Sequence, residues 1–305
     1  MFDIIVVGGG PAGITASIYA KRAGRNVAII EKYIAGGQLN LIGEIENYTG
    51  FENISGFELA DKLKQHAKRF DIPFIRDEVV DVNFNGTIKK VICKDKIYEA
   101  YAVVLAMGSH PRELNIDGEE KFKGKGVSYC ALCDGNFFKG KNVAVVGSGD
   151  SAFSDALYLA DICSNVYVLT KSQLKLHNYS LDEIEKVDNI KILKNALSKK
   201  ITGNENVQSL LYSQNEEDKN IDIDAVFVAI GRTPDTNYLN GKIEMTDRGY
   251  VKCDRKMKTN VDGVFACGDV REGEIKQIAT AVGDGAVAGS EANKYVLITK
   301  AKNKI

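Results

Sequence analysis

The sequence has almost no net charge, few metal-binding side chains and no long apolar run. Its 40 Lys and Arg residues nearly balance 41 Asp and Glu residues, so no overall field favours nucleic acid or an anionic membrane. No apolar run approaches the length of a membrane-spanning helix, and the first residues lack the basic start and cleavage site of a secretory signal. We therefore expect a cytoplasmic protein with no nucleic acid or membrane partner.

Cysteine is also sparse, with six residues in a chain of 305, which is too few for a disulfide scaffold. Only Cys130 and Cys133 lie close together in the sequence. With three histidines and no second Cys-x-x-Cys pair, the chain offers no evident zinc ligand set, and we expect no metal site. The remaining cysteines are expected to be small buried side chains: Cys93, Cys163, Cys253 and Cys267.

The N-terminal segment has the pattern of a nucleotide-binding βαβ unit. A short apolar strand over residues 3–7 leads through a glycine-rich turn into a helix over 11–23 and a second strand over 26–31. Such glycines permit a tight turn, the approach of a pyrophosphate and close helix–strand packing, while the acid that ends the second strand accepts hydrogen bonds from a ribose. The residues expected to bind this first nucleotide are Gly8, Gly10, Pro11, Ala12, Gly13 and Glu31.

The same pattern returns in the middle of the chain, over residues 142–147, 150–162 and 165–170. Gly147 takes the place of Gly8, and the register holds through the whole unit. The sequence therefore indicates an internal duplication and an α/β fold with two Rossmann-like dinucleotide-binding domains. The residues expected in the second nucleotide loop are Gly147, Gly149, Asp150, Ser151 and Ala152.

Cys130-Ala131-Leu132-Cys133-Asp134 lies between the two glycine-rich loops. A Cys-x-x-Cys pair can form a disulfide and gives one thiol a lowered pKa. The adjacent Asp134 is placed to carry a proton during thiol exchange. A dithiol beside two nucleotide sites indicates an electron relay to another disulfide.

Several further segments resemble flavin-binding motifs of the FAD-linked pyridine nucleotide-disulfide oxidoreductases. Residues 259–269 resemble the second flavin motif, which ends in Gly-Asp. Residues 276–281 resemble the segment whose helix N-terminus faces the flavin, with lysine where arginine is usual. The resemblance implies FAD contacts from Gly37, Gln38, Leu39, Asn47, Gly268, Asp269, Lys276, Gln277, Ile278 and Ala279.

The order of these motifs resembles the low-molecular-weight, bacterial-type thioredoxin reductases over nearly the whole chain. The resemblance implies that electrons pass from NADPH through FAD and the dithiol to thioredoxin, in a homodimer whose nucleotide domain rotates during turnover. It makes Cys133 the flavin-proximal thiol, Cys130 the thiol that attacks thioredoxin, and Asp134 the general acid/base. The middle pair Ala131-Leu132 departs mildly from the family's usual Ala-Thr or Ala-Val.

Because flavin motifs occur at both ends of the chain, the second unit is expected to be an insertion. We place the FAD-binding domain at residues 1–113 and 244–305 and the pyridine-nucleotide/disulfide domain at 114–243, with hinge strands near 110–115 and 241–245. Residues 57–70 are expected to be helical and 79–104 to form short strands. Residues 214–220 are expected to form a solvated hairpin turn.

The electron donor is the open question. Thr170 stands where Glu31 stands in the first unit, and Thr170-Lys171-Ser172 followed by Lys175 replaces the family's His-Arg-Arg clamp for a 2′-phosphate. Lysine binds phosphate without the bidentate fork of arginine. NADPH bound by these four residues, NADH, and a donor such as reduced ferredoxin all stay possible. So do a dithiol oxidase that passes electrons to oxygen and a non-enzymatic redox sensor.

Overall fold

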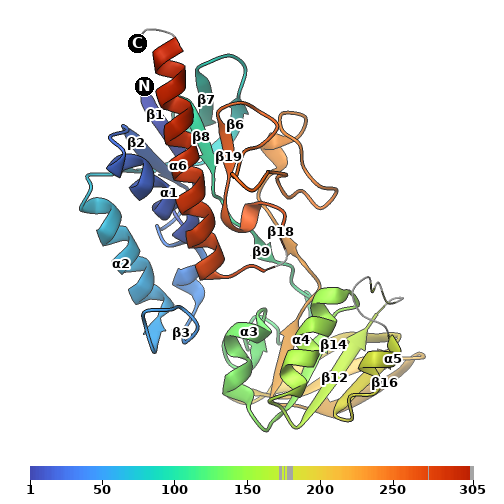
Figure 1. The fold of residues 1–305 in the computed structure, drawn as a ribbon. Coiled ribbons are helices and arrows are strands. Elements are labelled where there is room, and N and C mark those ends of the chain that lie inside the picture. Colours follow the sequence, from blue (N-terminus) through green and yellow to red (C-terminus); the bar gives the residue numbers. More distant parts are fainter. Residues whose placement is uncertain (172–173, 175, 177–180, 274, 303–305) are drawn as a thin grey trace. The chain divides into compact units, whose positions relative to one another are not determined.

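The computed structural model describes residues 1–171, 174, 176, 181–273 and 275–302. The chain divides into two compact units (Figure 1). Unit 1 comprises Met1–His110 and Thr233–Ile305, and unit 2, Pro111–Arg232, is inserted between these two segments. The chain passes between the units in β9 (His110–Pro111) and β18 (Arg232–Thr233), which pair with each other.

Unit 1 is built on a seven-stranded sheet in which β1 lies between two parallel neighbours, β2 and β8. Parallel strands on both sides of β1, reached by connections in opposite directions, create the switch point at which open α/β sheets bind ligands. The strands, in spatial order, are β5 (Phe74–Arg76), β2 (Val27–Glu31), β1 (Phe2–Val7), β8 (Ile97–Leu105), β7 (Lys89–Cys93) and β6 (Val79–Asn83), with β19 (Val264–Ala266) also paired to β8.

Both faces of this sheet are buried. Ile4 and Val6 of β1 pack into one apolar cluster, and Ile5 and Val7 pack into the other, as the two-residue period of a strand requires. The helices α1 (Pro11–Arg22) and α6 (Ile278–Lys302) run side by side on one face (Figure 1). An ion pair between Lys300 and Asp3, at 2.6 Å, joins the end of α6 to the start of β1.

The rest of unit 1 consists of short elements around the sheet. α2 (Gly56–Lys68) is an amphipathic helix whose N-cap, Ser55, accepts a hydrogen bond from Glu58 N. The other short elements are η1 (Gly37–Leu41), β3 (Glu44–Ile45), β4 (Ile54–Ser55), η3 (Asn237–Leu239) and η4 (Gly268–Val270).

Unit 2 repeats the plan on a smaller scale, with a five-stranded parallel sheet and a three-stranded antiparallel sheet. The parallel strands, in order, are β10 (Val127–Ser128), β17 (Ala225–Val228), β11 (Asn142–Val146), β12 (Asn165–Thr170) and β13 (Ile190–Lys194); the antiparallel strands are β14 (Ala196–Gly203), β15 (Val207–Gln214) and β16 (Glu217–Asp222). The helices are α3 (Ala131–Asp134), η2 (Gly135–Phe138), α4 (Asp150–Ala160) and α5 (Leu181–Ile184).

Both expected βαβ units form, each with its strand, glycine turn, helix and parallel second strand. The hairpin turn is shorter than expected. Its two central residues, Asn215 and Glu216, adopt positive φ angles of 53° and 67°, and the charged residues after them continue as β16.

The second crossover lies earlier than we expected. Residues 233–243, which we assigned to the inserted domain, belong to unit 1. The physical reason is burial, because Leu239 and Ile243 pack in the same apolar cluster as Ile5 and Leu105 of the unit 1 sheet. Within the part of the chain that the structure describes, no helix is both long and apolar enough to cross a membrane.

Candidate redox-active and nucleotide-binding sites

The two close cysteines form a disulfide, with a Cα–Cα distance of 5.3 Å. Cys130 is the extended residue that precedes α3, and Cys133 lies within that single helical turn. The backbone amides of Cys133 and Asp134 both donate to the carbonyl oxygen of Cys130, at 3.2 and 3.1 Å. The turn therefore brings the two thiols together without any long-range contact.

The four other cysteines are free thiols. Burial raises the pKa of the Cys163 thiol to about 11 and that of Cys93 to about 12. Cys267 is fully buried and Cys253 half-buried, and desolvation raises the pKa of both. All four therefore stay protonated near neutral pH, which leaves redox chemistry to the disulfide pair.

Asp134 ends α3, and its carboxyl group lies in a desolvated setting. Burial raises its pKa, while a hydrogen bond donated by Ser128 Oγ to Asp134 Oδ2, at 2.5 Å, opposes that rise. A carboxyl group that follows a disulfide cysteine directly, with its pKa raised by burial, is a candidate for proton transfer. The sequence singled out Asp134 but not Ser128, because nothing in the local motif marks a residue six positions earlier as its partner.

The first glycine loop joins β1 to α1 at the switch point of the sheet. Gly8 adopts φ 104°, and a Cβ there would collide with the carbonyl of Ala106, the residue that follows the neighbouring strand β8. A Cβ at Gly10 would meet no heavy atom within 4 Å, and no side chain caps the helix at this residue. This loop therefore fits a pyrophosphate, which needs an open backbone and the amides of a helix N-terminus.

Glu31 ends β2 beside this loop. Its Oε2 accepts a hydrogen bond from Gly9 N at 2.7 Å, and its Oε1 accepts one from Tyr33 N at 2.8 Å. A carboxylate has about four acceptor positions, so Glu31 keeps capacity for ribose hydroxyls. Its expected place at the nucleotide loop is the one that the structure shows.

Residues from distant parts of unit 1 gather around the same edge of the sheet. An ideal Cβ at Gly37 would lie 3.3 Å from Gly10 Cα, and Leu39 is buried in a small cluster against Ile278. Gln38 Nε2 donates to Ser109 O. Asn47 Nδ2 donates to Gln277 Oε1 at 3.2 Å, which joins the Asn47 loop to the start of α6.

The Gly268–Asp269 turn lies directly against the first loop. Gly268 has φ 72°, and a Cβ on it would lie 2.8 Å from Ala12 Cβ of α1. Lys276 Nζ donates to Arg271 O at 2.6 Å and to Asp269 O at 3.3 Å, and it lies 4.8 Å from the centre of the Tyr250 ring. Gln277 immediately precedes α6, while Ile278 and Ala279 form its first turn.

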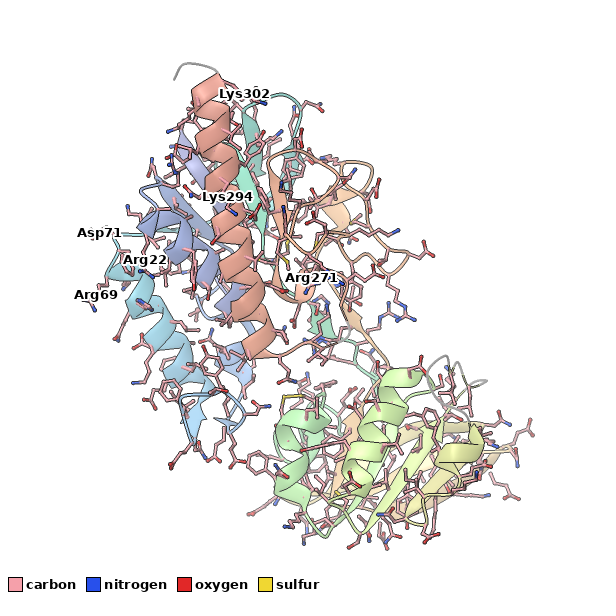
Figure 2. All side chains as sticks on the ribbon, viewed as in Figure 1. Arg22, Arg69, Asp71, Arg271, Lys294 and Lys302 are labelled. Carbon is pink, nitrogen blue, oxygen red and sulfur yellow. A yellow bond between two sulfur atoms is a disulfide. The ribbon has the colours of Figure 1, made fainter. Side chains whose placement is uncertain are left out.

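An ion pair that the sequence did not reveal supports this turn. Arg271 lies beside α6 (Figure 2) and donates from Nε and Nη2 to the two carboxylate oxygens of Asp284, at 2.6 and 2.9 Å. Asp284 also accepts a hydrogen bond from Gly268 N at 3.1 Å. The sequence signal was weak: Asp284 is the one charged residue in the small-residue first half of α6, which follows the Gly-Asp motif.

The second glycine loop, in unit 2, has the same construction. Gly147 N donates to Leu169 O at 3.1 Å, and a Cβ on Gly147 would collide with the Ala229 carbonyl. Gly149 precedes α4 with no side-chain cap, while Asp150 and Ser151 begin the helix. Ala152 is buried under the loop, where an ideal Cβ on Gly147 would lie 2.7 Å from it.

The strand end beside this loop differs from its counterpart in unit 1. Thr170 is only 1% exposed, and its Oγ1 is buried without a hydrogen-bond partner. A nucleotide cannot reach this hydroxyl in the conformation described, so the expected contact from Thr170 does not fit. Lys171 is exposed, whereas Ser172 and Lys175 lie outside the described residues.

These features define a two-domain α/β redox protein with a disulfide in its inserted domain. Residues 2–285 match the family model for pyridine nucleotide-disulphide oxidoreductases. The chain is 37% identical to thioredoxin reductase of Bacillus subtilis (strain 168) over 97% of its length and 95% of the relative's. It therefore belongs to the pyridine nucleotide-disulphide oxidoreductase family.

Two solved structures show how far the similarity extends. The crystal structure of thioredoxin reductase from Streptococcus pyogenes MGAS5005 matches with a TM-score of 0.92 and 37% identity, over 98% of this chain and 99% of that one. A ferredoxin-flavin thioredoxin reductase from Clostridium acetobutylicum matches with a TM-score of 0.55 and 33% identity, over 97% of this chain and 98% of that one. The expected fold, with two dinucleotide-binding domains, is confirmed.

Proposed function

We propose that this chain is a thioredoxin-disulfide reductase, an FAD-dependent enzyme with NADPH as its nicotinamide donor. The observation that carries the proposal is the Cys130–Cys133 disulfide beside Asp134 in the inserted domain. Relatives named thioredoxin reductase support it over nearly the whole chain. Thioredoxin is then the protein partner.

FAD belongs in unit 1. Its pyrophosphate would be held by the loop from Gly8 to Gly13 and its ribose by Glu31. Its flavin side would be held by residues 37–39, Asn47, the Gly268–Asp269 turn and the start of α6. When bound, FAD supplies a two-electron carrier between the donor and the disulfide.

The chain's own residues perform the disulfide chemistry. Reduction of the Cys130–Cys133 bond consumes two electrons and two protons, and Asp134 delivers a proton to a departing thiolate. Cys130 then loses its proton, and its thiolate attacks the thioredoxin disulfide, forming a mixed disulfide while the other thioredoxin sulfur leaves as a thiolate and takes up a proton. Attack of Cys133 on the Cys130 sulfur re-forms the internal disulfide and releases thioredoxin as a dithiol.

NADPH would bind at the second loop, through residues 147–152 and the N-terminus of α4. Of the four-residue clamp that we expected, Thr170 is buried, so its hydroxyl is not open to a 2′-phosphate, and Lys171 is exposed. This observation favours a second candidate, a reductase of the same fold that takes electrons from reduced ferredoxin. The match to a ferredoxin-flavin thioredoxin reductase is in keeping with that alternative.

The two candidates differ in the donor that reduces the holoenzyme. We would mix the FAD-loaded protein without oxygen with NADPH, NADH or reduced ferredoxin, and follow the visible flavin absorbance and the thiols formed on thioredoxin. NADPH is expected to bleach the flavin and to generate thioredoxin thiols. Bleaching by ferredoxin alone would establish the second candidate. Bleaching with no thioredoxin thiols from any donor would contradict the proposed activity.

A cytoplasmic location and a homodimer also belong to this proposal. Both rest on the resemblance of the whole chain to thioredoxin reductases. Sedimentation of the FAD-loaded protein at micromolar concentration tests the dimer, and a monomer at that concentration would contradict it.

A further inference from the structure

Ser128 connects the interchange cysteine to the acid of the redox site. It is the last residue of β10, is 5% exposed, and pairs with Phe227 of β17. Its Oγ accepts a hydrogen bond from Cys130 N at 3.1 Å and donates one to Asp134 Oδ2 at 2.5 Å. The result is a chain of two hydrogen bonds from the Cys130 backbone, through one hydroxyl, to the Asp134 carboxyl.

The direction of the second bond follows from the other acceptor within reach. A serine hydroxyl has one proton to donate. Its alternative, Cys130 O, lies farther away at 3.4 Å and already accepts the amides of Cys133 and Asp134. The hydroxyl proton therefore goes to the carboxylate, where a charge-assisted bond is about twice as strong as a neutral one.

We propose that Ser128 is a positioning residue for the disulfide chemistry, which fixes the Asp134 carboxyl relative to Cys130 and sets its proton affinity. The strand supplies the rigidity, because Ser128 is held in the sheet while α3 is a single turn. The role of Asp134 as acid/base rests on the proposed function. The hydrogen bond between Ser128 and Asp134, and its effect on the carboxyl group, do not depend on that function.

The ionisable side chains on the helices packed against α3 are few within the described residues. Of the helices packed against α3, η2 carries no ionisable side chain, and α4 carries Asp150, Asp155 and Tyr158. None of these contributes to the pKa shift of Asp134, which has burial and the Ser128 hydrogen bond as its causes. Removing the Ser128 hydroxyl therefore leaves burial, which raises the pKa of Asp134, without the hydrogen bond that opposes it.

The test measures the titration of Asp134 in the oxidised, FAD-loaded protein, without donor or thioredoxin. Carboxyl ¹³C shifts of labelled aspartate, with Asp134→Asn to assign the signal, give the midpoint directly. Ser128→Ala is expected to raise the midpoint by about one pH unit, a tenfold change in proton affinity. Ser164→Ala is the matched control, because it removes a serine hydroxyl that bonds a backbone carbonyl elsewhere in unit 2.

Ser128→Thr and Ser128→Val form a second pair of nearly equal volume, which isolates the hydroxyl if the alanine variant does not fold. The threonine variant keeps the hydroxyl and should titrate with the wild-type midpoint, and the valine variant should shift upward. In thioredoxin reduction, the pH profile should shift in the same variants and by the same amount. Equal midpoints in the threonine and valine variants would overturn the proposal. Shifted midpoints without thioredoxin turnover would instead contradict only the proposed function.

Discussion

Asp284 binds Arg271 through both carboxylate oxygens and also accepts the backbone amide of Gly268. The side chains are 13% and 27% exposed, so water screens this pair less than an open surface pair. The ion pair holds the turn that carries Asp269, a proposed FAD ligand. We infer that the pair stabilises the FAD site without itself contacting the reacting atoms.

Replacing Arg271 with Met should therefore weaken FAD binding at least tenfold, because Asp284 loses its partner while partly buried. The measurement is the dissociation constant of FAD from the reconstituted apoprotein, together with the melting temperature. Glu99→Gln is the control in the same unit, because it breaks an exposed ion pair with Lys90. Equal FAD affinity in both variants would contradict this role of Arg271.

Asp155 of α4 provides a test of pH dependence. Burial raises the pKa of its carboxyl from the ordinary 3.8 to about 6. The folded state therefore binds the proton more tightly than the unfolded state, so this residue favours folding below about pH 4 and loses that effect as the pH rises through 6.

Asp155→Asn should consequently stabilise the protein at pH 8, by about 1–3 kcal/mol, and have little effect near pH 4. Chemical unfolding at the two pH values measures the difference. Glu205→Gln, at an exposed loop position of unit 2, should change neither value. A gain for Asp155→Asn that is the same at both pH values would show that ionisation is not its source.

The buried hydroxyl of Thr170 predicts an unusual response to substitution. Thr170→Val replaces an unpartnered buried hydroxyl with a methyl group of similar size, so stability should be unchanged or rise by about 1 kcal/mol. The KM for NADPH should stay within about twofold of wild type. Lys171→Gln is the comparison, since it removes the exposed charge that we expect to bind the 2′-phosphate. A KM that rises tenfold in the valine variant would place Thr170 in the nucleotide site after all.

The fold was largely predictable because short local motifs mark where its strands end and its helices begin. Gly8 and Gly147 each follow an apolar strand and precede a helix, and that order alone defines both βαβ units. The second domain boundary was not predictable. Leu239 and Ile243 can be assigned to unit 1 only because they are buried in its apolar core, and no local motif marks that packing.

Some residues of the redox and nucleotide sites were likewise predictable from the sequence, and others were not. The dithiol and the loop glycines are marked by spacing, whereas Ser128 and Asp284 act through hydrogen bonds for which the sequence has no motif: one spans six residues and the other sixteen. The burial of Thr170 was not predictable, because register gives the position and the side of a residue on a strand but not how deeply that strand end is covered.

The roles of the two cysteines can be separated by trapping. In Cys133→Ser, the remaining Cys130 should attack thioredoxin and stay in a mixed disulfide, because no second thiol is present to resolve it. In Cys130→Ser, little adduct should form. Mass spectrometry of peptides from the trapped complex identifies the cysteine, and an adduct on Cys133 in preference to Cys130 would reverse the assignment.

The most direct test of the central claim is electron balance on thioredoxin. FAD-loaded enzyme, oxidised thioredoxin and a limiting amount of NADPH are mixed without oxygen, and the thiols on thioredoxin are counted. The account predicts two thiols for each NADPH consumed in the wild type and none above background in Cys130→Ser or Cys133→Ser, although FAD stays bound. Thioredoxin thiols formed at the wild-type rate by either serine variant would contradict an electron path through the Cys130–Cys133 disulfide.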